Sequence, residues 1–196
     1  MTGARGVSNR LSLVLGGVRS GKSSFALSLA TEIGGPVLFI ATAEGGDEEM
    51  RARIQQHKQQ RPGDWRTLEA PTGVGEAIPS SIGNARVVVL DCLSFLVANV
   101  MASVGDDEAQ VAAGVEAEAK DLLGAVARTD AQFIVVSNEV GMGVVPPYPS
   151  GRLFRDVLGW ANQRLARAAG RVYWMVAGLP VELKASGLAR DMRGGS

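Results

Sequence analysis

The stretch that decides the fold reads Leu11-Ser-Leu-Val-Leu-Gly-Gly-Val-Arg-Ser-Gly-Lys-Ser23. Its second part matches the G-x-x-x-x-G-K-[ST] pattern of a phosphate-binding loop, and the apolar run before it predicts a strand. Glycines in this loop let the backbone turn tightly, so that main-chain N–H groups and the following helix N-terminus can bind phosphate oxygens. Lys22 is expected to bridge the β- and γ-phosphates of a nucleoside triphosphate, and the Ser23 hydroxyl to ligate Mg²⁺. The expected nucleotide contacts are Gly16, Gly17, Val18, Arg19, Ser20, Gly21, Lys22 and Ser23.

Short apolar runs alternate with longer helical patterns along the rest of the chain. After the first run, strands are predicted at residues 37–42, 65–68, 87–90, 133–136 and 172–176. Helices are predicted at residues 23–33, 47–60, 107–127 and 151–169. This alternation predicts one α/β domain of the P-loop NTPase type, with a mostly parallel sheet flanked by helices. The expected catalytic domain spans residues 11–184, between a flexible N-terminal extension at 1–10 and a flexible tail at 185–196.

Composition narrows the range of partners. The 196 residues carry a formal net charge of zero, which gives no reason to expect affinity for nucleic acid or for an anionic membrane. No stretch approaches the ~20 apolar residues that membrane insertion requires. Cys92 is the only cysteine, which excludes an intrachain disulfide and a multi-cysteine metal site and is typical of a reducing cytoplasm.

Asp91 follows the apolar run at residues 87–90. The carboxyl ends of strands form the ligand crevice of an open α/β sheet, so Asp91 is expected to be a second Mg²⁺ ligand beside Ser23. The alternative is that Asp91 only caps a helix that begins near Leu93. The phosphate-binding loop favours the metal-binding interpretation.

His57 is the only histidine, near the end of the predicted helix at residues 47–60. A single histidine on the apolar side of a helix is more often structural than catalytic. Neutral imidazole can nonetheless attack an α-phosphate and form a covalent phosphoramidate. The neighbouring cations Lys58 and Arg61 favour the neutral ring, although they also fit an ordinary basic helix end. The residues alone leave both roles of His57 open.

Other conspicuous residues carry less information. The glycine- and proline-rich loop at residues 138–147 fits a plain connector as well as a loop that contacts substrate or another subunit. Cys92 and the three tryptophans are interpreted as packing residues. The arginines of the last long helix are interpreted as solvated side chains; they are Arg152, Arg155, Arg164 and Arg167.

Five stretches together carry a resemblance to a known family. They are GGVRSGKS from Gly16, FIATAE from Phe39, DEEMRARIQQHKQQRPGDWRTLE from Asp47, SNEVGMGVVP from Ser137 and FRDVLGWANQRLA from Phe154. In this order they resemble the bifunctional adenosylcobinamide kinase / adenosylcobinamide-phosphate guanylyltransferase family of cobalamin synthesis. Only the phosphate-binding loop is common outside that family, so the combination is specific.

The resemblance implies two reactions on a corrinoid. The first phosphorylates the hydroxyl of adenosylcobinamide with ATP or GTP. In the second, GTP guanylylates a histidine and releases pyrophosphate, and the GMP passes to adenosylcobinamide phosphate to give adenosylcobinamide-GDP. The histidine of the family falls on His57. The resemblance also implies assembly as a homotrimer. The composition predicts a cytoplasmic protein.

Further nucleotide contacts carry over from the resemblance. They are Thr42, Ala43, Glu44, Lys58, Gln59, Gln60, Arg61, Glu69 and Asp91. Two positions depart from the family pattern: Asp91 stands where better-known relatives have Glu, and Gln56 stands where some carry a second histidine. The competing interpretations are a kinase-only P-loop enzyme, which needs no His57, and a non-enzymatic nucleotide switch. The segment from Asp47 to Glu69 speaks against both, because it joins the lone histidine to neighbouring cations.

Overall fold

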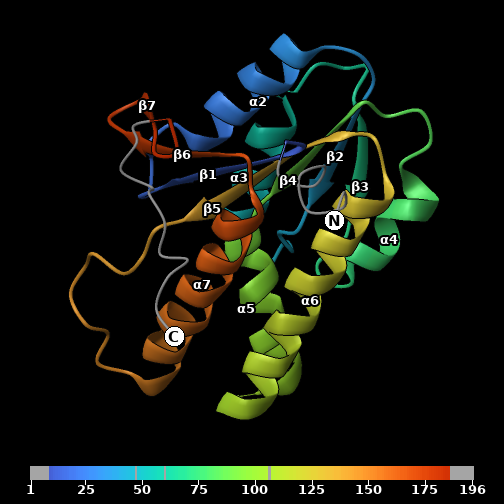
Figure 1. The fold of residues 1–196 in the computed structure, drawn as a ribbon. Helices are drawn as coiled ribbons and strands as arrows, with labels where there is room; N and C mark the ends of the chain where they lie inside the picture. Colours follow the sequence, from blue (N-terminus) through green and yellow to red (C-terminus); the bar gives the residue numbers. More distant parts are fainter. Residues whose placement is uncertain (1–8, 47, 60, 106, 186–196) are drawn as a thin grey trace, which may run out of the picture.

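The apolar runs pair into one seven-stranded sheet in the computed structural model of the chain, which describes residues 9–46, 48–59, 61–105 and 107–185 (Figure 1). The strands follow one another in space as β3-β2-β4-β5-β1-β6-β7. Every neighbouring pair is parallel except β6 and β7. The strands are β1 (Leu11–Gly16), β2 (Val37–Ala41), β3 (Arg66–Glu69), β4 (Val87–Asp91), β5 (Gln132–Asn138), β6 (Arg171–Val176) and β7 (Leu179–Glu182).

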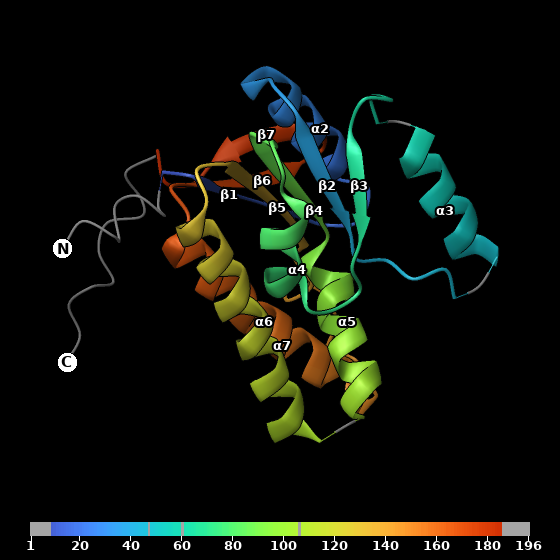
Figure 2. The same ribbon diagram turned by 90° about the vertical axis from the view of Figure 1, so that its right-hand side faces the viewer.

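Helices cover both faces of the sheet (Figures 1 and 2). On one face lies α2 (Lys22–Ile33), over a core that includes Val14, Phe39 and Ile134. Because the central strands are buried from both sides, they read as continuous apolar runs rather than as alternating patterns. The helices of the opposite face are α4 (Val74–Ser81), α5 (Leu93–Val104), α6 (Glu108–Arg128) and α7 (Pro149–Ala168).

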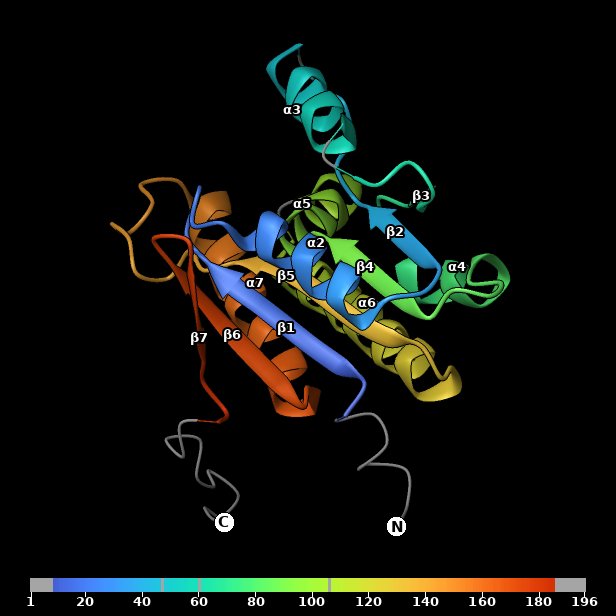
Figure 3. The ribbon, with the colours of Figure 1, turned by 90° about the horizontal axis from the view of Figure 1, so that it is seen from above.

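One helix, α3 (Glu48–Gln59), stands apart from both layers (Figures 2 and 3). It projects beyond the β2–β3 side of the sheet, on the connection between these two parallel strands. Its composition is strongly polar, and those of its side chains that the structure describes are exposed. No helix in the described part of the chain combines the length and apolar character that a membrane-spanning segment needs.

The predicted α/β architecture is confirmed, but α4 and β7 were not predicted, and α5 was foreseen only as a helix beginning near Leu93. The helix α4 contains Pro79, which ordinarily argues against a helix. The strand β7 is short, largely exposed and antiparallel to β6. The turn between them has Ala177 and Gly178 at positive φ, a hairpin turn without the usual Asn-Gly sequence.

Candidate nucleotide-binding and catalytic site

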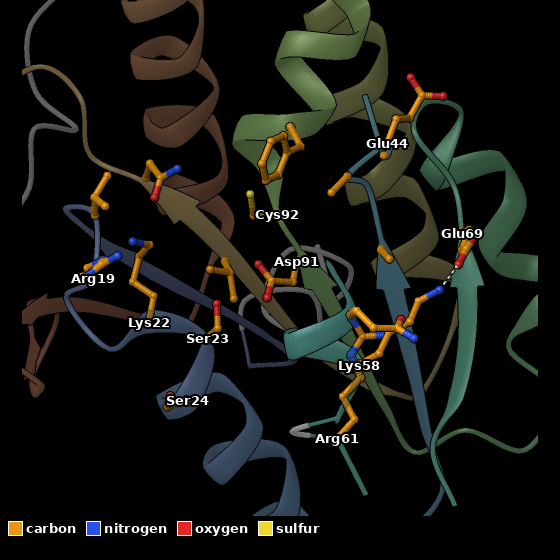
Figure 4. Close-up of a pocket in the computed structure, with 18 of the residues that line it drawn as sticks. Arg19, Lys22, Ser23, Ser24, Glu44, Lys58, Arg61, Glu69, Asp91 and Cys92 are labelled. Atoms are coloured by element: carbon orange, nitrogen blue, oxygen red, sulfur yellow. Dashed lines mark hydrogen bonds and ion pairs between the residues drawn. The ribbon is translucent and has the colours of Figure 1, made fainter. Parts of the chain in front are cut away.

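The carboxyl ends of the parallel strands meet at one edge of the sheet, where a cavity of about 1040 Å³ opens (Figure 4). One side of the cavity is formed by the loop after β1 and the first residues of α2, from Val18 to Ser24. The opposite side is formed by α3 and the end of β3. Between them lie the ends of β4 and β5. This is the edge at which open α/β sheets bind their ligands.

The loop between β1 and α2 has the backbone that a phosphate cradle requires. A Cβ on Gly16 would lie 2.6 Å from Ser20 Oγ and 2.7 Å from the Met175 carbonyl oxygen, so only glycine fits there. Gly21 caps α2 at a φ of 93°, in the left-handed region that glycine adopts without strain. The N–H of Gly178, in the β6–β7 turn, donates to the Ser20 carbonyl at 3.1 Å and supports the loop from behind. The first free N–H groups of α2 consequently face the cavity.

Lys22 is 9% exposed, and its Nζ donates to the Gly17 carbonyl at 2.6 Å. Burial lowers the pKa of Lys22, and the nearby acidic groups of Cys92 and Asp91 oppose that shift. In this arrangement the amine is held inside the loop. A bound phosphate would replace the carbonyl as its partner and favour the charged form.

Asp91 is half-buried at the end of β4 and lines the cavity. Figure 4 shows its carboxylate directed toward the side of the cavity on which Lys22 and Ser23 lie. The N-cap position of α5 is held by Cys92, not by Asp91. No cluster of three or more metal-binding side chains occurs among the described residues. A cation at Ser23 and Asp91 would therefore depend on phosphate oxygens and water for its remaining ligands, as Mg²⁺ commonly does.

Thr42 lies behind the cavity wall. Its side chain is fully buried; Oγ1 donates to the Cys92 carbonyl at 2.7 Å and accepts from the Cys92 N–H at 2.8 Å. Asn99 Nδ2 donates to the carbonyls of Thr42 and Pro71. These bonds tie the ends of β2 and β4 to α5. Cys92 packs in the core as predicted, and burial raises the pKa of its thiol to about 11.

An ion pair ties α3 to the end of β3. Lys58 Nζ lies 2.6 Å from Glu69 Oε1, and the dashed line in Figure 4 marks this contact. The hydrogen bond from Lys58 lowers the pKa of Glu69, and the charge of Lys58 adds to that effect. Both side chains remain substantially exposed, so the pair positions the helix more than it stabilises the fold.

Arg61 follows α3 and faces the same cavity. Its guanidinium carbon lies 3.6 Å from the centre of the Phe39 ring, a cation–π contact, and Nη1 donates to Thr67 Oγ1 at 3.4 Å. Burial lowers the pKa of Arg61, opposed by the charges of Asp91 and Glu69. A cation held in this way is oriented before any anionic ligand arrives.

Most of the predicted contact residues meet at this cavity. Those that line it are Val18, Arg19, Ser20, Gly21, Lys22, Ser23, Ala43, Glu44, Lys58, Arg61, Glu69 and Asp91. Gly16 and Gly17 form the base of the loop, while Thr42 and Gln59 do not line the cavity. The backbone of His57 belongs to α3, but its side chain lies outside what the structure describes, and Gln60 lies outside the described residues altogether.

The cavity also contains residues that the sequence analysis missed. Arg51 and Gln55 line the cavity from α3, four residues apart, and the predicted contact Lys58 follows three residues later. That spacing places them on one helix face, a pattern that could have identified them. Asn138, the first residue of the loop at 138–147 that fits a substrate contact as well as a connector, lines the cavity from the end of β5.

Two arginines on α7 have a role other than the predicted solvated one. Arg152 donates to the carbonyls of Pro146 and Pro147, and Arg155 donates to those of Gly141 and Val144. The loop at residues 138–147 is therefore anchored to α7. Apolar side chains of this region remain exposed, with Val144 at 94%.

Comparison of the sequence with known proteins identifies the family of this chain. Residues 12–183 match the family described as cobinamide kinase / cobinamide phosphate guanyltransferase. The chain belongs to this family. It is 40% identical over 179 residues to the bifunctional adenosylcobalamin biosynthesis protein CobU of Escherichia coli strain K12, covering 88% of this chain and 98% of that one. It is 41% identical over 172 residues to the corresponding CobP of Pseudomonas aeruginosa PAO1, with 88% and 96% covered.

A third relative, CobU of Salmonella typhimurium strain LT2, is 39% identical over 179 residues, covering 88% of this chain and 98% of that one. Among solved structures, the crystal structure of the RadB recombinase superposes with a TM-score of 0.50 at 17% identity, covering 84% of this chain and 73% of that one. At that identity the likeness concerns the fold alone. The predicted family and the P-loop α/β fold are thus confirmed.

Proposed function

We propose that this chain phosphorylates adenosylcobinamide and then transfers GMP from GTP to adenosylcobinamide phosphate. The observation that carries the proposal is the shared cavity. It joins a complete phosphate-binding loop to the face of α3 that bears Lys58, next to His57 in the chain. A kinase needs only the phosphate-binding loop, whereas nucleotidyl transfer through a histidine needs both the loop and the α3 side of the cavity. The names of the relatives and of the family support the same pair of reactions.

In the kinase step the cobinamide hydroxyl oxygen forms a bond to the γ-phosphorus. The bond from the γ-phosphorus to the β–γ bridging oxygen breaks, and the nucleoside diphosphate leaves. The loop N–H groups and Lys22 would hold the β- and γ-phosphates in line for this transfer. Catalysis of this kind consists mainly of positioning and charge stabilisation. ATP and GTP are both candidate donors, because the cradle binds only their common triphosphate.

In the guanylyl transfer step His57 would act as the nucleophile. A ring nitrogen of His57 bonds to the α-phosphorus of GTP, the bond to the α–β bridging oxygen breaks, and pyrophosphate leaves. A phosphate oxygen of adenosylcobinamide phosphate then bonds to the same phosphorus and releases His57. Lys58 and Arg61, which line the cavity, are placed to offset the added negative charge.

Mg²⁺ is proposed at Ser23 and Asp91. Both side chains line the cavity and offer oxygen donors, which fits the preference of this ion. When bound there, Mg²⁺ would neutralise triphosphate charge and orient the phosphates. Glu69 remains a candidate nucleotide contact, although its carboxylate is engaged by Lys58.

A homotrimer in the cytoplasm completes the proposal. The exposed apolar side chains of Met142, Val144, Tyr148 and Leu179 support self-association, and the buried free thiol of Cys92 is compatible with a reducing compartment. Light scattering of the purified protein should give three times the chain mass of 20.5 kDa.

The reactions can be tested with GTP labelled separately at the α- and γ-phosphates, together with adenosylcobinamide and Mg²⁺. We expect the γ-label in adenosylcobinamide phosphate and the α-label in the final adenosylcobinamide-GDP. Label transfer from the γ-position alone would indicate a kinase-only enzyme. Binding of GTP without transfer of either label would indicate a nucleotide switch.

A further inference from the structure

A polar side chain without an assigned role lies at the centre of the ligand-binding edge. The strand order there is β4-β5-β1, and these strands end at Asp91, Asn138 and Gly16 respectively. Asn138 is the register partner of Gly16, the first residue of the phosphate-binding loop. It therefore lies between the strand that begins the loop and the strand that carries the acidic side chain.

The alternation along β5 directs Asn138 toward the phosphate loop. Ile134 and Val136 pack in the core on the α2 side of the sheet, and Asn138 continues the same alternation. Asn138 lines the cavity together with Val136. Its backbone N–H and carbonyl are hydrogen-bonded, whereas its side-chain amide makes no hydrogen bond within the described part of the chain.

Three elements fix the backbone of Asn138. Its N–H donates to Ser94 Oγ of α5 at 3.2 Å, and its carbonyl accepts from Asn162 Nδ2 of α7 at 3.0 Å. The next N–H, of Glu139, donates to the Gly16 carbonyl at 3.0 Å. Ser94 and Asn162 are themselves buried. These bonds fix the backbone from which the Asn138 side chain projects, at a set position relative to the loop.

We propose that the Asn138 side-chain amide donates a hydrogen bond to the γ-phosphoryl group during phosphorylation of cobinamide; this inference rests on the proposed kinase reaction. In that step the cobinamide hydroxyl oxygen bonds to the γ-phosphorus, the nucleoside diphosphate leaves with the bridging oxygen, and the hydroxyl proton passes to water. An amide cannot accept that proton, so Asn138 acts by stabilising charge on the transferred group.

The proposal separates the two reactions of the site. In the proposed complex the loop and Lys22 would hold the β- and γ-phosphates, next to the end of β5 where Asn138 lies. Guanylyl transfer takes place instead at the α-phosphorus, two bridging oxygens away, and its nucleophile belongs to the α3 wall. Loss of the Asn138 amide should accordingly slow phosphorylation selectively.

The test compares Asn138→Ala and Asn138→Asp with wild type, using Asn84→Ala, an exposed position outside this cavity, as the control. For Asn138→Ala we expect kcat for cobinamide phosphorylation to fall about 100-fold, as for loss of one transition-state donor, with KM for the nucleotide changed less than about 3-fold. The rate of protein guanylylation by GTP should stay within about 3-fold of wild type. The Asp side chain of Asn138→Asp has the shape of Asn but repels the phosphate. This variant should therefore phosphorylate cobinamide no faster than Asn138→Ala.

Unchanged phosphorylation in either variant, or an equal loss in both reactions, would overturn the proposal. If Asn138→Ala fails to fold, Asn138→Asp carries the same comparison. If wild-type protein guanylylates itself but makes no cobinamide phosphate, the proposed kinase reaction is refuted, and the inference about Asn138 is refuted with it. That outcome is distinct from an active wild type whose variants are equally active, which refutes the role of Asn138 alone.

Discussion

Lys22 is a buried amine that is hydrogen-bonded within the phosphate-binding loop. It is 9% exposed and bonds to the Gly17 carbonyl, so it is positioned before any nucleotide arrives. Its burial lowers its pKa, which means that the free site is less favourable to the charged amine than water is. A bound triphosphate has the opposite effect, because its charge favours the protonated form.

This difference predicts a pH dependence of nucleotide binding. Between the lowered pKa of Lys22 in the free protein and its higher pKa in the complex, binding takes up a proton. GTP affinity should therefore fall as the pH rises through the alkaline range, by up to about tenfold per pH unit. Calorimetry in buffers of different ionisation enthalpy measures the uptake. Lys22→Met should bind weakly without this dependence, and affinity that rises with pH would contradict the account.

Two adjacent glycines provide a matched test of the loop backbone. A Cβ at position 16 meets Ser20 Oγ at 2.6 Å and the Met175 carbonyl at 2.7 Å, whereas a Cβ at position 17 meets nothing within 4 Å. Gly16→Ala should lower the free energy of unfolding by about 2 kcal/mol, since the carbonyl contact cannot relax cheaply. Gly17→Ala should change it by less than about 0.5 kcal/mol. Urea unfolding measures both, and similar values for the two would argue against this loop geometry.

At the scale of elements, α3 differs from every other described helix in how it is held. The other helices pack apolar faces on the sheet, whereas the described side chains in and just after α3 link it to the sheet through the Lys58–Glu69 pair and Arg61. A helix held by polar contacts opens at low cost in free energy. A helix that opens easily suits the proposed guanylyl transfer, in which α3 would present His57 to the α-phosphate. The kinase step would not need this contact.

Glu69→Gln should loosen α3 without unfolding the protein. We expect faster hydrogen exchange of the α3 amides, while the free energy of unfolding changes by less than about 1 kcal/mol. Because Lys58 lowers the pKa of Glu69, the pair is present above the usual pKa of a glutamate and is lost as the pH falls through the lowered value. Glu182→Gln, at the 4.0 Å pair with Arg171 on the other side of the sheet, is the control and should leave α3 unchanged. Equal exchange of α3 in both variants would refute the tether.

The contact between α4 and α6 gives a second prediction at this scale. A Cβ on Gly75 would lie 2.2 Å from the carbonyl carbon of Asp121, so the two helix backbones touch there. Gly75→Ala should destabilise the fold by about 2 kcal/mol or more. Gly159 in α7 has open space around it, and Gly159→Ala should stabilise by about 0.5 to 1 kcal/mol. Thermal and urea unfolding measure both changes, and a neutral Gly75→Ala would contradict the close contact.

Across the whole molecule, the sequence predicted what is local and periodic. The phosphate-binding loop follows from a motif whose glycines are sterically required, and the central strands follow from apolar runs buried on both faces. The helix α4 escaped because Pro79 contradicts a helix unless the surrounding packing overrides it. Asn138 escaped because its importance comes from β5 lying between β4 and β1, an order that no local pattern encodes. Thr42 carried over from the resemblance as a nucleotide contact, yet its side chain bonds to the backbone of Cys92.

The central claim is that a histidine on α3 and the phosphate-binding loop serve one nucleotide. It is tested most directly by incubating the protein with Mg²⁺ and α-labelled GTP, denaturing it, and locating the adduct by peptide mass analysis. The account predicts an acid-labile, alkali-stable GMP adduct on His57 that is absent from His57→Ala. The adduct should still form in Lys58→Ala, which lacks the neighbouring nitrogen nucleophile, the Lys58 amine. An adduct that persists in His57→Ala, or wild-type protein that binds GTP and forms none, would contradict it.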